Sequence, residues 1–398
     1  MDDSIYRLRT RDILTLCVLA LLALGVLMVQ SASTNITGEP GWHWTERGTK
    51  HVEFAVVALA VFFVVGHIDY SKLIAPGMSI KRSPITWLLV LSMICCVLVL
   101  VPHVGMEVNG ARRWIKLGPI QVQPSEMAKW ATVLFLCWWM TVRPVNIEKF
   151  FGGFLVTLLP IGVICLLVVI QDFGTAALIG VCSVTIMLAG RVKWWHMALV
   201  LPPAMAAAFW FVHHEPYRWK RITAFVNPYA APQGEGYHMI QSLLSFTTGG
   251  IFGKGLGNGI QKLGYLPEDT TDFIFSVICE ELGLFGAMLT VALYLGIIYV
   301  SWQIVMQKRD SFGRLLAFGV GSMIGLQAII NIAVATVSAP TKGLSLPLVS
   351  AGGSGLVITC AALGLLYSVA RFEREEDTIE QSLLDDEPFR LLPTKLAA

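Results

Sequence analysis

The strongest constraint on this chain is a series of apolar runs, each about as long as a membrane is thick. They lie at about residues 13–30, 51–67, 84–102, 126–142, 151–170, 174–190, 195–212, 274–302, 315–337 and 351–370. About 20 apolar residues in a helix span the hydrocarbon core of a bilayer, and a helix satisfies its backbone hydrogen bonds within the segment. The runs therefore predict an all-α polytopic membrane protein with about ten transmembrane helices.

The composition agrees with a membrane protein and argues against other classes. Hydrophobic residues make up 55% of the 398-residue chain and charged residues only 14%, whereas a soluble domain carries roughly 25% charged residues. A net charge of +2 without a basic run gives no indication of nucleic-acid binding. The eight cysteines lie in apolar stretches and form no CxxC pair, so they are interpreted as small hydrophobic residues rather than as disulfide or metal ligands.

Basic residues between the runs predict the orientation of the chain, because short cytoplasmic loops collect Lys and Arg. With the N-terminus inside, every cytoplasmic connection is basic, through Arg7, Arg9, Arg11, Lys72, Lys81, Arg82, Arg143, Lys149, Arg191, Lys193, Lys308, Arg309, Arg314, Arg371 and Arg374. This predicts a cytoplasmic N-terminus (1–12), a ten-span membrane domain (13–372) and a cytoplasmic tail (373–398). The tail is acidic and polar, which predicts disorder.

A large extracytoplasmic loop (213–272) is predicted between spans 7 and 8. It contains an apolar stretch, Met239–Phe246, that predicts a helix and is followed by a glycine-rich segment. Glycine permits positive φ angles and close backbone approach. Two interpretations of this segment are therefore open, a flexible surface loop and an ordered, partly re-entrant loop.

The outer side carries basic residues that work against the orientation rule, which indicates that they bind anionic groups. They are Arg112, Arg113, Lys116 and Lys129 near the fourth span, and Arg218, Lys220, Arg221, Lys254 and Lys262 in the large loop. Arg113 precedes Trp114 and suits either bidentate phosphate binding or headgroup anchoring. In the helix entry QPSEMAK, Glu126 and Lys129 either contact an anionic ligand or pair with each other.

Five carboxylates surround the start of the eighth run, in YLPEDTTDFIFSVICEELG. They are Glu268, Asp269, Asp272, Glu280 and Glu281. A charge exposed to lipid tails costs about 2.5–3.5 kcal/mol at the bilayer centre, so we expect an outer-facing, water-filled cavity with Asp272 at its rim and Glu280 deeper. The alternative is that these acids form structural ion pairs with basic residues of the outer loops.

Two further segments carry polar residues between spans. Asp172 lies in a short outer turn, IQDFGTA, and Lys342 lies in a Pro/Gly-rich break, APTKGLSLPLVSAGGSG, before the last run. The break predicts either a discontinuous helix that lines a cavity or tight helix packing. No nucleotide-binding loop, HExxH or GxSxG motif is present.

These motifs resemble those of the SEDS family (shape, elongation, division and sporulation), which is typified by FtsW and RodA. The segments that carry the resemblance are NGARRWIKLGPIQVQPSEMAK, QDFGTA, GLGNGIQKLGYLPEDTTDFIFSVICEELG and NIAVATVSAPTKGLSLPLVSAGGS. They occur in the family order across nearly the whole chain, and QKLGYLPE and PTKGLSLP are closer to the FtsW branch. The sequence departs from the family pattern at Gln171, Thr270, Ala351 and Gly355, where the family usually has Pro, His, Tyr and Ser.

The resemblance implies a peptidoglycan glycosyltransferase that polymerises glycan strands from lipid II at the outer face of the bacterial cytoplasmic membrane. It implies a class B penicillin-binding protein, a transpeptidase, as partner, together with other cell-division proteins. It also implies that Asp272 matches the essential aspartate of the family, Arg113 the arginine before tryptophan, and Glu126 and Lys129 the polar pair of the QPSExxK motif.

The expected reaction is an inverting glycosyl transfer that releases undecaprenyl pyrophosphate. Asp272 is predicted to be the general base, and cationic side chains are predicted to stabilise the leaving group. The residues expected to contact pyrophosphate or sugar are Arg113, Glu126, Lys129, Arg218, Arg221, Glu268, Lys342 and Ser350. A divalent cation, Mg²⁺ or Mn²⁺, is compatible with this chemistry, but no ligand spacing identifies a metal site.

Three alternatives are open at this point. A flippase for lipid-linked oligosaccharides also uses intramembrane charges and broken helices, but the ionisable residues here gather on the outer half. An elongation polymerase of the RodA type and a non-catalytic scaffold of the division or elongation machinery are the others.

Overall fold

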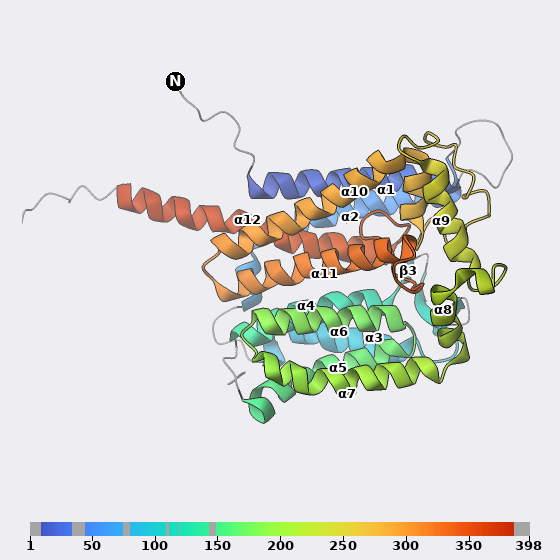
Figure 1. Ribbon diagram of the computed structural model, residues 1–398. Helices are drawn as coiled ribbons and strands as arrows, with labels where there is room; N and C mark the ends of the chain where they lie inside the picture. Colours follow the sequence, from blue (N-terminus) through green and yellow to red (C-terminus); the bar gives the residue numbers. More distant parts are fainter. Residues whose placement is uncertain are drawn as a thin grey trace, which may run out of the picture.

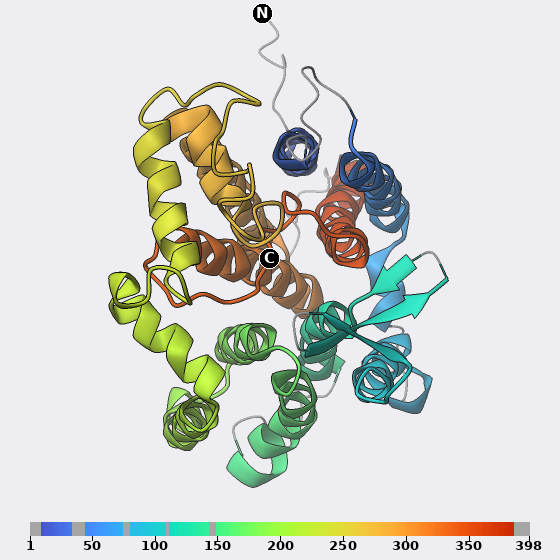
Figure 2. The same ribbon diagram turned by 90° about the vertical axis from the view of Figure 1, so that its right-hand side faces the viewer.

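Ten helices lie at the ten predicted positions in the computed structural model, which describes residues 9–33, 44–74, 80–108, 111–118, 120–142 and 149–385. They are α1 (Thr10–Ser33), α2 (Glu46–His67), α3 (Pro84–Leu98), α4 (Pro124–Val142), α5 (Leu155–Val169), α6 (Phe173–Ala189), α7 (Trp194–His213), α10 (Ile274–Gln307), α11 (Ser311–Ala335) and α12 (Ser354–Asp385). They run along one bundle, seen from the side in Figure 1 and end-on in Figure 2. The chain is a polytopic, all-helical membrane protein.

The described helices differ in how well they suit a bilayer. Seven are long and apolar enough to cross a membrane, namely α1, α2, α5 with the preceding π-helical turn η3 (Phe150–Phe154), α7, α10, α11 and α12 as far as Phe372. α3 and α6 are shorter apolar helices. α4 carries Glu126 and Lys129 near its start, and these lower its mean hydropathy. The number of spans therefore remains a prediction of about ten.

Small residues allow the helices to pack closely. This is usual in membranes, where the hydrophobic effect does not drive helices together. α12 packs along α2, and α10 lies between α1 and α11. A Cβ on Gly364 of α12 would lie only 2.6 Å from the carbonyl oxygen of Phe62 on α2.

α7 packs much less closely against the other helices. His196, Met197 and Val212 are its only buried residues, and its exposed surface is apolar. An exposed apolar surface on a long helix fits contact with lipid.

One end of the bundle, called the sheet end, carries additional structure. A three-stranded antiparallel sheet of β1 (Gly105–Val108), β2 (Ala111–Leu117) and β3 (Ile120–Val122) precedes α4. In its register Ile115 lies opposite both Gly105 and Val122. The predicted outer loop contains α8 (Pro216–Val226), the short η4 (Pro228–Ala230) and α9 (Tyr237–Gly249). The helix predicted at Met239–Phe246 is confirmed within α9. At the opposite end lie the short helices η1 (Tyr70–Ile74) and η2 (Ile80–Arg82).

The structure differs from the sequence expectations in two helices. α10 is broken at Gly283, which has φ 64° and ψ −157°, so it is not one continuous helix. α12 continues through residues 373–385, which belong to the tail predicted to be disordered, because no Gly or Pro interrupts that stretch. The rest of that tail, 386–398, and most of the predicted cytoplasmic N-terminus, 1–8, lie outside the described residues.

Candidate active site

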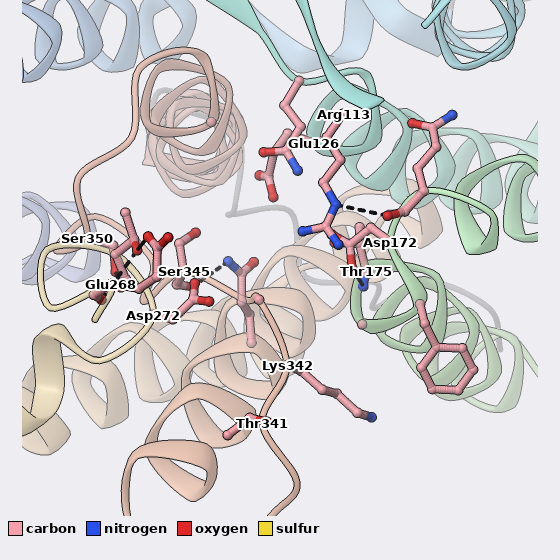
Figure 3. A pocket seen from close by; sticks show the side chains of 18 of the residues that line it. Arg113, Glu126, Asp172, Thr175, Glu268, Asp272, Thr341, Lys342, Ser345 and Ser350 are labelled. Carbon is pink, nitrogen blue, oxygen red and sulfur yellow. Dashed lines mark hydrogen bonds between the residues drawn. The ribbon is translucent and has the colours of Figure 1, made fainter. Parts of the chain in front are cut away.

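A cavity of about 950 Å³ opens at the sheet end and is lined by charged side chains from six parts of the chain. β2, α4, α6, α8, the segment before α10 and the α11–α12 loop (residues 336–353) all contribute (Figure 3). Its charged lining residues are Arg113, Glu126, Asp172, Glu215, Arg218, Arg221, Glu268, Asp272 and Lys342. Both signs of charge therefore meet in one water-accessible space, as a site for a charged substrate requires.

Asp272 lies two residues before α10, and its backbone is held by the α11–α12 loop and α11. The side-chain amide of Asn331 donates to the carbonyl oxygens of Asp272 (2.8 Å) and Leu344 (2.7 Å). The hydroxyl of Ser350 donates to the carbonyl oxygen of Thr271 (2.5 Å). Among the described residues, no group donates a hydrogen bond to the Asp272 carboxylate. The main chain at Asp272 is thus fixed while its carboxylate stays available to a ligand.

The pKa of Asp272 suits a proton acceptor at neutral pH. Burial raises it from its ordinary value to about 7, and the nearby negative charges of Glu268 and Asp172 contribute in the same direction. The positive charges of Arg113 and Arg221 act against this rise. A carboxyl group whose pKa lies near the working pH is well matched to general-base catalysis.

Arg113 on β2 faces the same part of the cavity as Asp272. A Cβ on Gly343 would lie 3.4 Å from Asp272 Oδ2 and 3.5 Å from Arg113 Nη1, so the backbone at Gly343 lies beside both side chains. Arg113 Nε donates to the carbonyl oxygen of Gln171 (2.9 Å), and the Gln171 amide donates to Cys96 O (2.8 Å). No carboxylate within the described residues pairs with Arg113, so its two terminal nitrogens can bind an anion.

The remaining cationic side chains of the cavity differ in their partners: two lie near aromatic rings, and one pairs with a carboxylate. Lys342 Nζ lies 5.3 Å from the centre of the Phe173 ring, and burial lowers the pKa of this lysine. The Arg218 guanidinium lies over the ring of Phe211, 3.9 Å from its centre. In contrast, Arg221 pairs with Glu235 at 3.6 Å. Lys342 and Arg218 are therefore better placed than Arg221 to interact with an anionic ligand.

Lys129 does not line the cavity, contrary to its predicted role as a substrate-binding residue. It is fully buried, and its Nζ lies 2.7 Å from Glu126 Oε2 and 2.7 Å from Gln327 Oε1. Only Glu126 of this pair lines the cavity. The alternative interpretation, in which Glu126 and Lys129 pair with each other, is the one observed, because the i, i+3 spacing brings both groups together on one face of α4.

Glu280 is not the deeper wall of the cavity, and this expectation was wrong. Both Glu280 and Glu281 are fully buried, away from the cavity lining. Glu280 pairs with Lys254 at 2.9 Å and Glu281 with Lys262 at 2.8 Å. The structural ion pairs considered from the sequence are therefore present for these two acids. Asp272 is separate from them because it precedes α10, where Asn331 of α11 and Ser350 of the α11–α12 loop bond to the main chain at Asp272 and Thr271.

The site residues that sequence reasoning missed are amides that hold backbone in place. Gln327 and Asn331 lie four residues apart on α11, and both donate to carbonyl oxygens of the α11–α12 loop. Two buried amides on one face of an apolar run are a signal that the sequence offers. Asp172 caps α6 through Thr175, accepting hydrogen bonds from its backbone N–H (3.1 Å) and hydroxyl (2.7 Å).

The described residues contain no group of three or more His, Cys, Asp or Glu side chains that could hold a metal ion. The cavity lining includes the carboxylates of Asp272 and Glu268, but the described residues do not gather them with a third ligand. A divalent cation at the site stays a proposal.

Comparison with known proteins places the chain in a family. Residues 11–375 match the family model FtsW/RodA/SpoVE, described as cell cycle protein. The chain belongs to this family, as the sequence motifs predict.

Named relatives and solved structures are similar over most of the chain. It is 36% identical over 361 residues to a probable peptidoglycan glycosyltransferase FtsW of Coxiella burnetii, covering 90% of this chain and 95% of the relative. It is 39% identical over 368 residues to the FtsW of Alkalilimnicola ehrlichii with the same description, covering 89% and 88%. A chain in a structure of a peptidoglycan synthase complex aligns with TM-score 0.73, 28% identity and coverage of 90% and 97%. The rod shape determining protein RodA of Thermus thermophilus aligns with TM-score 0.64, 25% identity and coverage of 90% and 96%.

Proposed function

We propose that the chain polymerises the glycan strands of peptidoglycan from lipid II during cell division. The observation that carries this proposal is the carboxylate of Asp272, which pairs with no described residue and has a pKa of about 7 in a cavity that also presents Arg113. Membership of the family and the FtsW relatives described as probable peptidoglycan glycosyltransferases support it. Those relatives also favour the division role over a RodA-type elongation role.

The proposed reaction follows from these groups. The 4-hydroxyl of the acceptor GlcNAc attacks the anomeric carbon of the donor MurNAc, and the bond from that carbon to the pyrophosphate oxygen breaks with inversion. Asp272 takes the hydroxyl proton and later passes it to water, a contribution of typically 10²–10⁴ in rate for a general base. Arg113, Lys342 and Arg218 stabilise the negative charge that develops on the departing undecaprenyl pyrophosphate.

The other candidate residues have supporting roles in this proposal. Glu126 and Glu268 line the cavity and would contact sugar hydroxyls, while Arg221 acts mainly through its charge. Ser350 fixes the main chain at Thr271, and Lys129 holds Glu126. A Mg²⁺ or Mn²⁺ ion, if the reaction uses one, would offset pyrophosphate charge beside Asp272 and Glu268.

The proposed setting is the bacterial cytoplasmic membrane with both termini inside and the sheet end outside, since the basic connections lie at the other end. A class B penicillin-binding protein and other division proteins are the proposed partners. The similarity to a chain of a peptidoglycan synthase complex supports such an assembly.

A lipid II flippase remains the second candidate because broken helices also occur in transporters. A flippase requires a polar path through the bundle. All charged residues that line the cavity belong to segments at the sheet end, and this distribution favours the polymerase.

The decisive experiment is a polymerisation assay with purified protein and labelled lipid II, with and without its transpeptidase. Asp272→Asn keeps the size of the side chain but removes the base, so we expect folded protein and no glycan polymer. Asp269→Asn is the matched control, because Asp269 also has a pKa raised by burial, to about 6, but does not line the cavity. Undiminished polymer from Asp272→Asn would contradict the proposed role.

A further inference from the structure

Residues 250–265, here called the glycine loop, form backbone hydrogen bonds with α10 on both sides of its break at Gly283. The backbone N–H groups of Lys254 and Gly255 donate to the carbonyl oxygens of Glu280 (3.0 Å) and Glu281 (2.9 Å). In return, the N–H of Leu284, just beyond the break, donates to the carbonyl oxygens of Gly250 and Ile251, at 3.1 Å each. The loop thereby satisfies helix backbone groups that the break leaves unpaired, which is required at membrane depth. Figure 1 shows the loop at the sheet end of the bundle, near α10 and α1.

Both charged side chains of the glycine loop point into the protein. Lys262 is fully buried, with its Nζ 2.8 Å from Glu281 Oε1 and 3.0 Å from Ser31 Oγ. Lys254 reaches Glu280 at 2.9 Å with its side chain 24% exposed. Backbone N–H groups of the loop also donate to both carboxylates. A loop surrounded by water usually turns its lysines outward, and this one does the opposite.

The outer surface of the glycine loop is apolar. Phe252 is 81% exposed, and the other exposed large apolar side chains of the loop are Ile251, Leu256, Ile260, Leu263 and Tyr265. Phe252 lies 5.9 Å, ring centre to ring centre, from Phe285 on α10. Phe285 is itself exposed and belongs to the exposed apolar face of α10, so the loop surface and that face are continuous. Asn258 is the exposed amide of this surface, and it donates to Lys254 O (3.2 Å).

The level of the loop along α10 places it at the edge of the hydrocarbon core. From Leu284 to Gln307, α10 has 24 residues (307 − 284 + 1), about 36 Å at 1.5 Å per residue. The hydrocarbon core is about 30 Å thick. Residues level with Leu284 therefore lie near the boundary between acyl chains and headgroups, where apolar side chains of peripheral segments insert.

We propose that the glycine loop inserts its apolar side chains, with Phe252 foremost, into the membrane interface of the leaflet at the sheet end. The occupant of this surface is lipid, because the surface is continuous with the lipid-facing side of α10. Glu280 and Glu281 make the insertion possible by holding the two lysines inside the protein. This insertion is independent of catalysis and of the glycosyltransferase proposal.

The test is spin-label accessibility in the full chain, purified into phosphatidylcholine nanodiscs. Labels are placed at Phe252→Cys and, as a second site that guards against misfolding, at Ile260→Cys. Leu289→Cys on the exposed face of α10 is the lipid reference, and Gln233→Cys in the exposed α8–α9 connection is the water reference. The unsubstituted chain is the labelling blank, because its eight cysteines are buried or half-buried.

We expect labels at both loop sites to collide with oxygen as the Leu289 label does and to collide several-fold less with a water-soluble nickel complex than the Gln233 label. If the loop labels collide with the nickel complex as often as the Gln233 label does, the loop lies in water and the proposal is wrong. The apolar surface would then be a candidate contact site for a protein partner. Shielding from both reagents would also overturn the proposal, because it would show a second copy of the chain covering the loop.

Discussion

Asp272 combines burial with neighbouring negative charge, and this predicts how activity depends on pH. A general base works only when ionised, so the initial rate of polymerisation should fall as the pH decreases through about 7, the raised pKa of Asp272. Glu268 is one of the charges that raise this pKa. Glu268→Gln should therefore move the acid limb of the profile to lower pH. Rate profiles of both proteins on each side of neutrality measure the shift, and an unchanged profile or a shift to higher pH would contradict it.

Arg113 and its neighbour Arg112 form a matched pair for testing anion binding. Arg113→Lys keeps the charge but loses the donor to Gln171 and the paired terminal nitrogens. Hydrogen bonds to charged groups contribute about 1.5–3 kcal/mol, so kcat/KM for lipid II should fall roughly ten- to hundredfold. Arg112→Lys should have little effect, because Arg112 lies outside the cavity lining and pairs with the exposed Glu107 at 3.6 Å. Equal losses from both variants would exclude a specific role for Arg113.

At the scale of elements, the α11–α12 loop depends on the amide of Asn331. Asn331→Ala would leave the carbonyl oxygens of Asp272 and Leu344 without this donor, at about 1–3 kcal/mol for each unpaired group. We expect a lower Tm and a lower kcat. Asp272 would also be free to move toward water, which would lower its pKa and shift the acid limb of the pH–rate profile to lower pH.

The control for Asn331 is Ser368 on α12, far from the cavity. Its buried hydroxyl donates to Ile68 O (2.7 Å) and accepts from Tyr70 N (3.2 Å). Ser368→Ala should lower Tm to a similar degree but leave the pH profile unchanged. If the two variants change the pH profile equally, Asn331 has only a structural role.

The buried pair of Glu281 and Lys262 predicts a large loss of stability when one partner is removed. Glu281→Gln leaves a fully buried lysine without its counter-charge, and breaking a buried pair in this way costs about 3–5 kcal/mol. Lys254→Gln also leaves a buried charge, that of Glu280, but it should cost less, because Glu280 keeps the hydrogen bonds from the backbone N–H groups of Ile260 and Gln261. Thermal unfolding of both variants in detergent compares them. The double change Glu281→Gln with Lys262→Met should recover part of the loss, and no recovery would argue against the pair.

The elements that sequence analysis predicted are those specified by local pattern. The apolar runs locate the helices because length and hydropathy alone decide whether a segment can span a bilayer. The sheet 105–122, the break at Gly283 and the extension of α12 beyond Phe372 were not predicted. The break depends on hydrogen bonds from the glycine loop, and such contacts between distant segments leave no periodic signal in either segment.

The cavity is a property of the whole molecule, and this limits what the sequence alone reveals about it. Asp272, Arg113 and Lys342 were identified as candidates, and all three line one cavity. Only the family resemblance implied their proximity, since it arises from the packing of β2, the segment before α10 and the α11–α12 loop. The same limit explains Lys129, whose charge suggested a ligand contact until the rotation of α4 was known. Sequence identifies reactive residue types, but their burial depends on tertiary packing.

The topology of the whole chain is the remaining prediction, and α4 is the helix that decides it. If all ten helices cross the membrane, exposed positions should alternate between the two sides, with Val104 and Gln233 outside and Lys149, Arg191 and Gln307 inside. A single cysteine at each position, reacted with a membrane-impermeant maleimide, should be labelled in intact spheroplasts only at the two outside positions. The inside positions should react only after permeabilisation.

Val104 and Lys149 flank α4, whose buried Glu126 and Lys129 lower its mean hydropathy. Pairing with each other and with Gln327 offsets part of the cost of placing these charges at membrane depth, so we expect α4 to cross. Labelling of Val104 and Lys149 from the same side would show that it does not. It would also reverse the side assigned to every later connection, because each further crossing alternates from the one before. The sheet end could then not present β2 and α8 to the same compartment, which the cavity between them requires.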